Sequence, residues 1–300
     1  KGLAGHVVQT GETINIKDAY NDKRFNPNVD KKTGYRTKTI LCMPIKNFNQ
    51  EIIGVFQVLN KFDEYFTPDD EDLLIAIASS AGISLENAQL FERQRKLLEE
   101  QKVVLDSFIE TLATSIDARD KITSGHSSRV KMYSSLIAQE FGMEKNDLYI
   151  LEKAAALHDI GKIGIRDSVL QKEGKLTPEE YKHIQQHVEI THHILEKIHM
   201  SEDFKQITEI ACSHHEKFDG TGYYRHLKGE EIPFGGRILA VSDVFDAITS
   251  KRHYRDKMPI EKVIDIIKNG AGSHFDPLVV DKFLDIKLSK IVGVFITENH

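Results

Sequence analysis

The chain has 300 residues, of which 40% are hydrophobic, and it carries a formal net charge of −6. This length fits two domains, and the acidic balance argues against a general nucleic-acid binder, so a site for an anionic substrate has to be locally basic. The two cysteines, Cys42 and Cys212, stand in unrelated contexts and fit a reducing compartment without disulfides. No apolar run approaches the roughly 20 residues that span a bilayer, and no signal peptide opens the chain. We therefore expect a soluble, cytoplasmic protein, or the soluble part of a larger one.

Residues 1–75 are predicted to form a mixed α/β domain. Two β-branched runs, at 39–47 and 51–62, are joined by polar residues, which predicts a hairpin of antiparallel strands. The stretch at 17–36 is rich in Asn, Asp, Lys and Gly, a composition typical of a long loop. This loop is either a lid over a small molecule or plain surface.

A helix is predicted to begin after Thr67, because a Thr cap, a Pro in the first turn and three acidic residues are usual at a helix N-terminus. Apolar residues then recur at three- and four-residue steps to about Asp117, with no Pro and a single glycine, Gly82. So long a pattern suggests that residues 76–117 form a connecting helix that pairs with a second copy of the chain in a homodimer. The alternative is a helix that ends near Gln94 and lies back on its own domain.

Residues 118–300 are predicted to form a second domain. Up to about residue 285 they hold successive amphipathic helices separated by turn signals, and no convincing strand appears before the apolar run at 290–297. We therefore expect a multidomain chain in which an all-α helical bundle follows the α/β domain.

Metal-ligand residue types recur through the helical region, each inside a specific local sequence such as SGHSSRV, ALHDIGKIGI or SHHEKFDGTGYY. The set consists of His126, His158, Asp159, His187, His214, His215 and Asp243. Adjacent helical residues point about 100° apart, so one member of a neighbouring pair can bind one ion while the other reaches a second ion. Imidazole and carboxylate suit iron, manganese, zinc or nickel, and a carboxylate shared between two ions is a usual basis for a hydrolytic dinuclear site.

Basic residues stand near these ligands, where a phosphodiester would need them. Lys162 follows Asp159 by three residues and so shares its helical flank, while Arg252 and Arg255 follow the last ligand position on the same predicted helix. Arg offers bidentate contact to phosphate, and Lys offers a compact charge. The tight loop after the His pair adds two candidates for substrate contact, Gly222 and Tyr223.

Residues 118–285 resemble the HD-GYP branch of the HD phosphohydrolase superfamily, through HDIGK, HHEKFDGTGYY and LKGEEIPFGGRILAVSDVFDAITSKRHYR. The resemblance implies hydrolysis of the bacterial second messenger cyclic di-GMP to linear pGpG, and on to GMP, by a metal-bridging hydroxide. It implies two divalent metals, iron first, with manganese or nickel as alternatives. One metal would be held by His126, His158, Asp159 and Asp243, and the other by Asp159, His187, His214 and His215. Asp159 and Lys162 are then the catalytic candidates: Lys162 would meet the phosphate with Arg252 and Arg255, or would instead protonate the leaving group.

Two positions depart from that family's pattern. Tyr224 stands where the Gly-Tyr-Pro motif has its Pro, in a loop associated in the family with substrate access and partner contact. Ile122 stands where some members have a Glu that helps to bind a third metal. A third metal is therefore not favoured, although Asp117 and Asp120 lie near enough to keep it open. Asp246 is predicted to support the ligand geometry rather than to ligate.

Residues 1–90 resemble the later half of a GAF domain, N-terminally incomplete in this sequence. The motif that carries the resemblance consists of Asn60, Lys61, Phe66, Asp70 and Glu71. It implies a sensor domain with an antiparallel sheet and an unknown small-molecule ligand. Lys61 and Asp70 are predicted to form a structural ion pair between strand and helix rather than to contact that ligand.

The leading hypothesis is a metal-dependent cyclic di-GMP phosphodiesterase regulated by its GAF domain, with neither DNA nor a membrane as partner. One alternative is a catalytically silent receptor that binds cyclic di-GMP and signals to a protein partner; the intact ligands disfavour it, and Tyr224 is the feature in its favour. Another keeps hydrolysis but takes a different cyclic dinucleotide or a nucleotide monophosphate.

Overall fold

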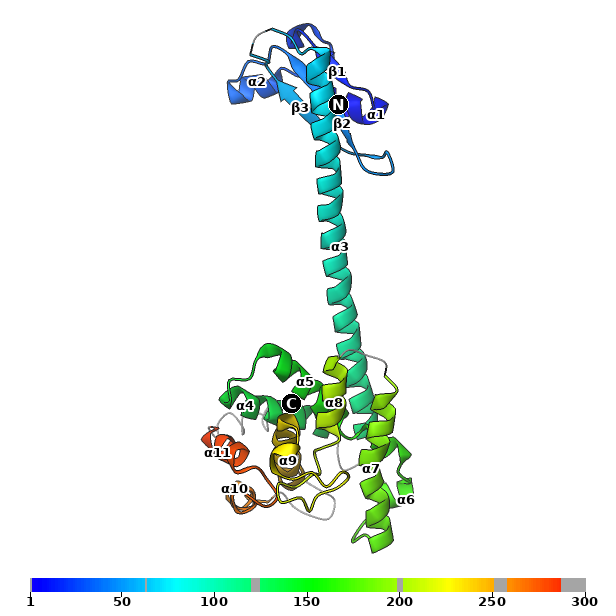
Figure 1. Cartoon of the computed structure of the whole chain (residues 1–300), viewed down its shortest axis with the longest axis vertical. Coiled ribbons are helices and arrows are strands. Elements are labelled where there is room, and N and C mark those ends of the chain that lie inside the picture. Colours follow the sequence, from blue (N-terminus) through cyan, green and yellow to red (C-terminus); the bar gives the residue numbers. More distant parts are fainter. Residues whose placement is uncertain (1, 63, 120–124, 199–201, 251–257, 287–300) are drawn as a thin grey trace. The chain divides into compact units, whose positions relative to one another are not determined.

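A computed structural model describes residues 2–62, 64–119, 125–198, 202–250 and 258–286 (Figure 1). The chain divides into two compact units, 1–102 and 103–300. The first unit is α/β and the second is helical, as the sequence predicted. The domain boundaries placed after residues 75 and 117 stay predictions. The strand predicted at 290–297 lies outside the described residues.

The first unit is built on a three-stranded antiparallel sheet in the order β1-β2-β3. Its strands are β1 (Ile14–Ile16), β2 (Ile40–Lys46) and β3 (Ile52–Leu59). The antiparallel pairing of β2 with β3 confirms the predicted hairpin. The helical elements before the hairpin are α1 (Leu3–Thr10), η1 (Ala19–Asn21) and α2 (Asn28–Thr33).

The stretch at 17–36 is more ordered than the plain loop that its composition predicts, because it contains η1 and α2. Asp30 in α2 is buried, and its carboxylate accepts hydrogen bonds from the backbone N (2.6 Å) and the hydroxyl (2.8 Å) of Thr37. These two bonds tie the end of the stretch to the chain that enters β2. Its role as a lid stays a prediction.

The GAF motif residues connect the sheet to the helix that follows it. Asn60 adopts a left-handed conformation (φ 56°), and its side-chain oxygen accepts a hydrogen bond from Lys38 N at 2.6 Å. The Lys61 ammonium lies 2.5 Å from Asp70 Oδ2, in the strand-to-helix pairing expected of the motif. The remaining motif positions are Phe66, which is buried, and Glu71, which accepts a hydrogen bond from Asn15 at 2.7 Å.

The helix α3 (Pro68–Arg119) is 52 residues long and contributes to both units. In the first unit Leu74 and Ala78 pack against side chains of β2. In the second unit Ile109, Ala113 and Ile116 recur at helical spacing and belong to one of its hydrophobic cores. The unit boundary, between residues 102 and 103, lies within this helix.

The second unit is a bundle of helices in which α9 lies against α4, α8, α10 and α11 (Figure 1). Its elements are α4 (His126–Glu140), α5 (Lys145–Leu157), η2 (Ile160–Gly164), α6 (Asp167–Leu170), α7 (Pro178–Glu196), α8 (Glu202–Ala211), η3 (Gly229–Glu231), α9 (Phe234–Thr249), α10 (Ile260–Asn269) and α11 (Pro277–Asp285). Ile238, Val241 and Phe245 of α9 are completely buried, so this helix is the centre of the larger core. Among the described residues of this unit, the β structure is a single bridge between Ala271 and Phe275.

One helix of the described chain, α3, is long and apolar enough by composition to cross a membrane. Length and composition alone are weak evidence, because the core helix of a soluble protein passes the same test. Leu74 and Ala78 near the start of α3 pack on the sheet, but only 11% of its most apolar stretch is buried within the described chain. The cytoplasmic location stays a prediction.

The single glycine of α3 generates the first test. A Cβ at Gly82 would lie 2.4 Å from the carbonyl oxygen of Lys46 at the end of β2. Alanine gains about 1 kcal/mol in helix propensity, but overpacking of this kind costs about 1–3 kcal/mol, so the clash should win. We expect Gly82→Ala to lower the urea midpoint of the first unit, measured by circular dichroism. Ser80→Ala on an exposed position of the same helix should not lower it, and an unchanged midpoint for Gly82→Ala would contradict this account of the packing.

Candidate metal centre

The structure brings all seven ligand positions predicted from the sequence into one site of the second unit. They come from the start of α4 (His126), the end of α5 and the residue after it (His158, Asp159), the interior of α7 (His187), the turn after α8 (His214, His215) and the interior of α9 (Asp243). Six of the seven are buried, and His215 is partly exposed. Two groups within this set have ligand atoms close enough together to hold an ion.

The first group contains His126, His158 and Asp159. The Nε2 atoms of His126 and His158 lie 3.3 Å apart, and Asp159 Oδ2 lies 3.4 Å from the Nε2 of His158 and 3.6 Å from that of His126. Asp243 approaches from α9, with Oδ1 3.3 Å from His126 Nε2. The four side chains predicted to hold one metal therefore converge.

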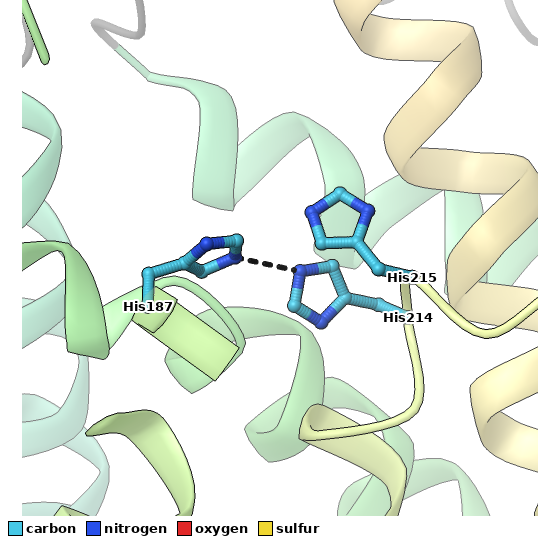
Figure 2. A group of neighbouring side chains, drawn as sticks. All are labelled: His187, His214 and His215. Carbon is cyan, nitrogen blue, oxygen red and sulfur yellow. Dashed lines mark hydrogen bonds between the residues drawn. The ribbon is translucent and has the colours of Figure 1, made fainter. Parts of the chain in front are cut away.

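The second group contains His187, His214 and His215 (Figure 2). The Nε2 atoms of His187 and His214 lie 3.3 Å apart, and the ring of His215 is centred 5.1 Å from that of His187. Asp159 Oδ1 lies 3.4 Å from His187 Nε2, whereas its other oxygen faces the first group. The carboxylate of Asp159 thus lies between the two groups, where a shared ligand has to be.

The adjacent pair His158-Asp159 lies at the junction between α5 and η2. The sequence argument had instead assumed that both residues belong to one continuous helix. His158 caps α5 and Asp159 precedes the 3-10 helix η2. In a 3-10 helix, positions i and i+3 eclipse each other, so Lys162 turns back and its Nζ lies 2.7 Å from Asp159 Oδ2. Lys162 is therefore the charged partner of Asp159 in the metal-free protein.

A glycine allows this junction to approach α7. A Cβ at Gly161 would lie 1.9 Å from the carbonyl oxygen of His187, so no other residue fits there without movement of the backbone. Thr191 of α7 completes the contact: its hydroxyl accepts a hydrogen bond from Gly161 N at 3.0 Å and donates one to the carbonyl of His158 at 3.1 Å. The two ligand groups are therefore held together by backbone packing.

Hydrogen bonds at the far side of each ring decide which nitrogen is available to an ion. The Nδ1 atoms of His158, His187 and His214 lie 2.6–2.7 Å from the carbonyl oxygens of the residues three positions earlier. A carbonyl can only accept, so each Nδ1 carries the proton and each Nε2 presents a lone pair. Between His187 and His214 two such lone pairs face each other at 3.3 Å, an arrangement that a cation would relieve. The donor set therefore fits divalent metal ions.

His126 is oriented by a charged partner and not by a carbonyl. Its Nδ1 lies 2.7 Å from Asp246 Oδ2, and Arg129 donates to both oxygens of Asp246 at 2.6 and 3.0 Å. Asp246 therefore holds a ligand in place without facing the ligand cluster itself, the role predicted for it. The supporting Arg129 was missed, although it lies inside the quoted SGHSSRV sequence; its partner Asp246, more than a hundred positions away, is brought to it only by the fold.

The electrostatics keep the ligands in the forms that bind metal. Burial lowers the pKa of His187, lowers that of His214 well below its usual value, and lowers that of His215 to about 3. Burial by itself would raise the pKa of Asp159, but the positive charge of Lys162 acts against burial, and the pKa lies well below the usual range. These imidazoles are therefore neutral and this carboxylate is ionised at pH 7.

His126 behaves differently. Burial by itself would lower its pKa, but hydrogen bonds to Asp243 and Asp246 outweigh burial and raise the pKa to about 10. The metal-free protein therefore holds a proton on this imidazole near neutral pH. A metal that takes its Nε2 has to displace that proton.

The ligands open into a cavity of about 440 Å³. Its lining includes Lys162 and, among residues that the sequence analysis did not single out, Tyr181, Lys217 and His274. Lys217 lies inside the quoted HHEKFDGTGYY motif, so the motif itself could have suggested it. His274 follows α10 in the chain, and its carbonyl accepts a hydrogen bond from Phe218 N at 3.2 Å, a contact that only the fold creates.

The other residues that the sequence analysis discussed for substrate contact or access differ in where the structure places them. Gly222 allows the loop to lie on the His215 segment, because a Cβ there would be 2.3 Å from Lys217 N. Tyr223 lines the cavity and stacks on His215, with ring centroids 4.8 Å apart. Tyr224 lies away from the ligands, with its ring 6.0 Å from that of His192. Arg252 and Arg255 lie outside the described residues.

A third metal gains no support from the described residues, because Asp117 belongs to neither ligand group. Its two carboxylate oxygens accept hydrogen bonds from the backbone N and the hydroxyl of Ser127 at 3.0 and 2.8 Å. Asp120 and Ile122, the other positions considered for a third ion, lie outside the described residues.

Comparisons with known proteins agree with this geometry. The model of the HD domain matches residues 110–279, and that of the GAF domain matches residues 1–85. A 3'3'-cGAMP-specific phosphodiesterase of Vibrio cholerae is 35% identical over 240 residues, covering 79% of this chain and 44% of the relative. A cyclic di-GMP phosphodiesterase of Thermotoga maritima is 42% identical over 179 residues (60% and 48%), and the cyclic di-GMP phosphodiesterase response regulator RpfG of Xanthomonas campestris is 39% identical over 192 residues (63% and 50%). The chain spans about half the length of these relatives.

The shared carboxylate predicts the metal content. Asp159→Asn keeps the size of the side chain but removes its negative charge, so one oxygen can no longer serve each ligand group. We expect metal per chain to fall from about two to one or fewer, measured by mass spectrometry of protein purified with Mn(II). Asp281→Asn on the exposed face of α11 is the matched control and should keep the full metal content. Two metals per chain in Asp159→Asn would disprove the shared-ligand geometry.

The contrast between His126 and the other imidazoles predicts a proton count. The raised pKa means that His126 is protonated at pH 7.5 until metal binds, whereas His187, His214 and His215 are already neutral. Metal titration of the metal-free protein should therefore release about one proton per chain. Calorimetry at pH 7.5 in buffers of different ionisation enthalpy measures this number. Asp246→Asn should reduce it, and release of no proton from the wild type would contradict the assignment.

Proposed function

The chain belongs to the HD-domain family, and from this premise we propose that it is a metal-dependent phosphodiesterase acting on a cyclic dinucleotide. The observation that carries the proposal is the position of Asp159, with one oxygen toward each histidine group at the wall of a cavity. The three relatives described above, which are named for cyclic di-GMP or 3'3'-cGAMP, support the class of substrate.

Two divalent ions would be held by the residues that converge around Asp159. His126, His158 and Asp243 would complete the first site, and His187, His214 and His215 the second. Bound there, the ions would supply Lewis acidity toward the phosphoryl oxygens and a water activated for attack. Nitrogen and oxygen donors suit iron, which the family resemblance favours, and also manganese or nickel.

Cationic side chains of the cavity would bind and orient the phosphodiester. Lys162 lies beside the shared carboxylate, and Lys217 lines the same cavity from the loop after the His pair. Their charges would stabilise the negative charge that develops on the phosphoryl oxygens. Lys162 could alternatively give its proton to the departing ribose oxygen. Arg252 and Arg255 remain candidates from the sequence for the same phosphate.

The products and the exact dinucleotide follow from the family and not from the cavity. We propose cyclic di-GMP as substrate, opened to linear pGpG and then cleaved to GMP. 3'3'-cGAMP is the second candidate, because a relative named for it covers 79% of this chain. The two substrates differ in one base, so the choice depends on contacts at some distance from the metals.

The first unit would supply regulation by a small molecule. It has an open cavity of about 510 Å³ lined by the basic Lys17, Arg36 and Lys38, by the acidic Asp18 and Glu64, and by Lys61, which is paired with Asp70. Tyr20 and Tyr65 line it too, and Arg36 stacks over Tyr20 with its guanidinium carbon 5.1 Å from the ring centre. Aromatic and charged side chains together fit a ligand with a planar group and polar substituents.

The exposed part of α3 supports a homodimer. Apolar side chains recur there at seven-residue intervals, at Ile83, Leu90, Leu97 and Val104, and each is 51–67% exposed. Such spacing is typical of a helix that pairs with a copy of itself. A dimer through this helix would cover a stripe that the described residues of one chain leave in solvent.

The test is anaerobic hydrolysis by the whole chain loaded with Fe(II) or Mn(II), offered cyclic di-GMP and 3'3'-cGAMP separately. We expect the linear dinucleotide or mononucleotide as product. Lys162→Ala should lower kcat by about 10²–10³-fold, the usual effect of losing one group that stabilises transition-state charge. Lys182→Ala, an exposed lysine of α7 outside the cavity, should stay within about twofold of wild type.

Each other outcome has a definite meaning. Tight binding of a cyclic dinucleotide to metal-loaded protein without any product would support the silent receptor and overturn the proposal. Turnover of 3'3'-cGAMP alone would keep the enzyme and change its substrate. Equal loss of activity in Lys162→Ala and Lys182→Ala would remove Lys162 from the reaction.

A further inference from the structure

The last turn of α3 makes an unusual set of contacts with the segment that carries Asp159 and Lys162. Arg119 Nη1 donates to the carbonyl oxygens of Lys162 (3.0 Å) and Ile163 (2.6 Å), and its Nη2 donates to that of Ile165 (2.8 Å). Its Nε donates to Asp167 Oδ1 at 3.1 Å. One guanidinium therefore has four acceptors, three of which are backbone carbonyls within four residues.

These carbonyls belong to the C-terminal end of η2. A helix leaves its last carbonyls without internal donors, and a 3-10 helix has poorer hydrogen bonds than an α-helix, so a segment this short needs outside support. A cation at a helix C-terminus is also favoured by the helix dipole. Arg119 supplies donors and charge at that point. The helix η2 in turn sets the direction of Lys162, which lies within it, and of Asp159, the residue that precedes η2.

The same turn of α3 also contacts the segment that carries His126, another member of the first ligand group. Asp117 accepts hydrogen bonds from the backbone N and the hydroxyl of Ser127, at 3.0 and 2.8 Å. Ser127 is adjacent to the ligand His126, at the beginning of α4. Within three residues, α3 therefore contacts the segments of two metal ligands that come from different elements.

We propose that Arg119 and Asp117 are positioning residues, through which the last turn of α3 sets the placement of His126 relative to Asp159 and Lys162. The inference deepens the proposed function, on which it rests, by giving regulation a route: a shift or rotation of this turn changes the geometry of the shared carboxylate. Because α3 begins at Pro68, the turn is the terminus of the helix that also packs on the sheet of the first unit.

The experiment compares the whole chain loaded with Mn(II) as wild type, Arg119→Ala, Arg119→Lys and Asp167→Ala. The first readout is the electron paramagnetic resonance signal of exchange-coupled Mn(II) pairs, which depends on the shared ligand and needs no turnover. The second is kcat with the substrate that the wild type accepts. Asp167→Ala removes the ion pair but keeps the three carbonyl contacts, so it separates the effect of η2 from a simple loss of surface charge.

We expect Arg119→Ala to alter the coupled signal and to lower kcat by about tenfold or more, since small displacements of reacting groups have such effects. Asp167→Ala should leave both readouts near those of wild type, and methylguanidinium should partly restore Arg119→Ala. Both readouts of Arg119→Lys should lie between those of wild type and Arg119→Ala, because one ammonium cannot contact three carbonyls in the way that the planar guanidinium does. An unchanged signal together with kcat within about twofold of wild type in Arg119→Ala would overturn the proposal.

Two controls keep the result interpretable. If Arg119→Ala does not fold, Arg119→Lys and Asp117→Asn take its place, and wild-type signals in both overturn the proposal. If the wild type shows no turnover with any cyclic dinucleotide but the Mn(II) signal still changes in Arg119→Ala, the positioning role stands and the proposed enzyme fails. If the wild type is active but the Mn(II) signal is unchanged in the variants, the proposed enzyme stands and the positioning role fails.

Discussion

The metal centre depends on one buried carboxylate, that of Asp159. Taking an unpaired carboxylate out of water is strongly unfavourable, so the side chain has to be surrounded by compensating groups. Lys162, with its Nζ 2.7 Å from Oδ2, provides the compensating positive charge in the metal-free protein. Because the carboxylate faces both histidine groups at once, every element that carries a ligand has to direct its side chain toward the same point.

Four of the five ligand rings reach that point in two ways. Three imidazoles are oriented by the carbonyl three residues before them, a local feature of each segment. His126 instead depends on Asp246 of α9, which is itself held by Arg129 of α4. The fifth ring, that of His215, stacks on Tyr223. Among the other four rings, His126 alone is set by packing between two helices, and its pKa is raised to about 10. Tertiary contact here changes the chemistry of a ligand as well as its position.

The helix α3 contributes apolar residues at helical spacing to a hydrophobic core in each of the two units. Near its start, Leu74 and Ala78 pack on a sheet, and near its end Ile109, Ala113 and Ile116 pack among helices. Between them the apolar residues stay exposed, so the periodicity that suggested a pairing helix has no partner within the described residues of the chain. The last residues of the helix also make polar contacts: Asp117 accepts a hydrogen bond from Ser127, next to His126, and Arg119 donates to the segment that follows Asp159.

The sequence by itself determined the hairpin, the start of α3, the helical nature of the second unit and the residues that converge at the candidate metal centre, because periodicity, helix caps and motif-embedded histidines are local signals. It did not determine the 3-10 form of η2 or the close approach of Gly161 to the backbone of His187. Nor did it indicate the contact of Arg129 with Asp246 or the place of His274 at the cavity, since both arise from segments far apart in the chain. Local sequence signals indicate what chemistry each residue can perform. Only packing decides which residues lie together, and a carboxylate can be shared between two ligand groups only where several segments of the chain come together.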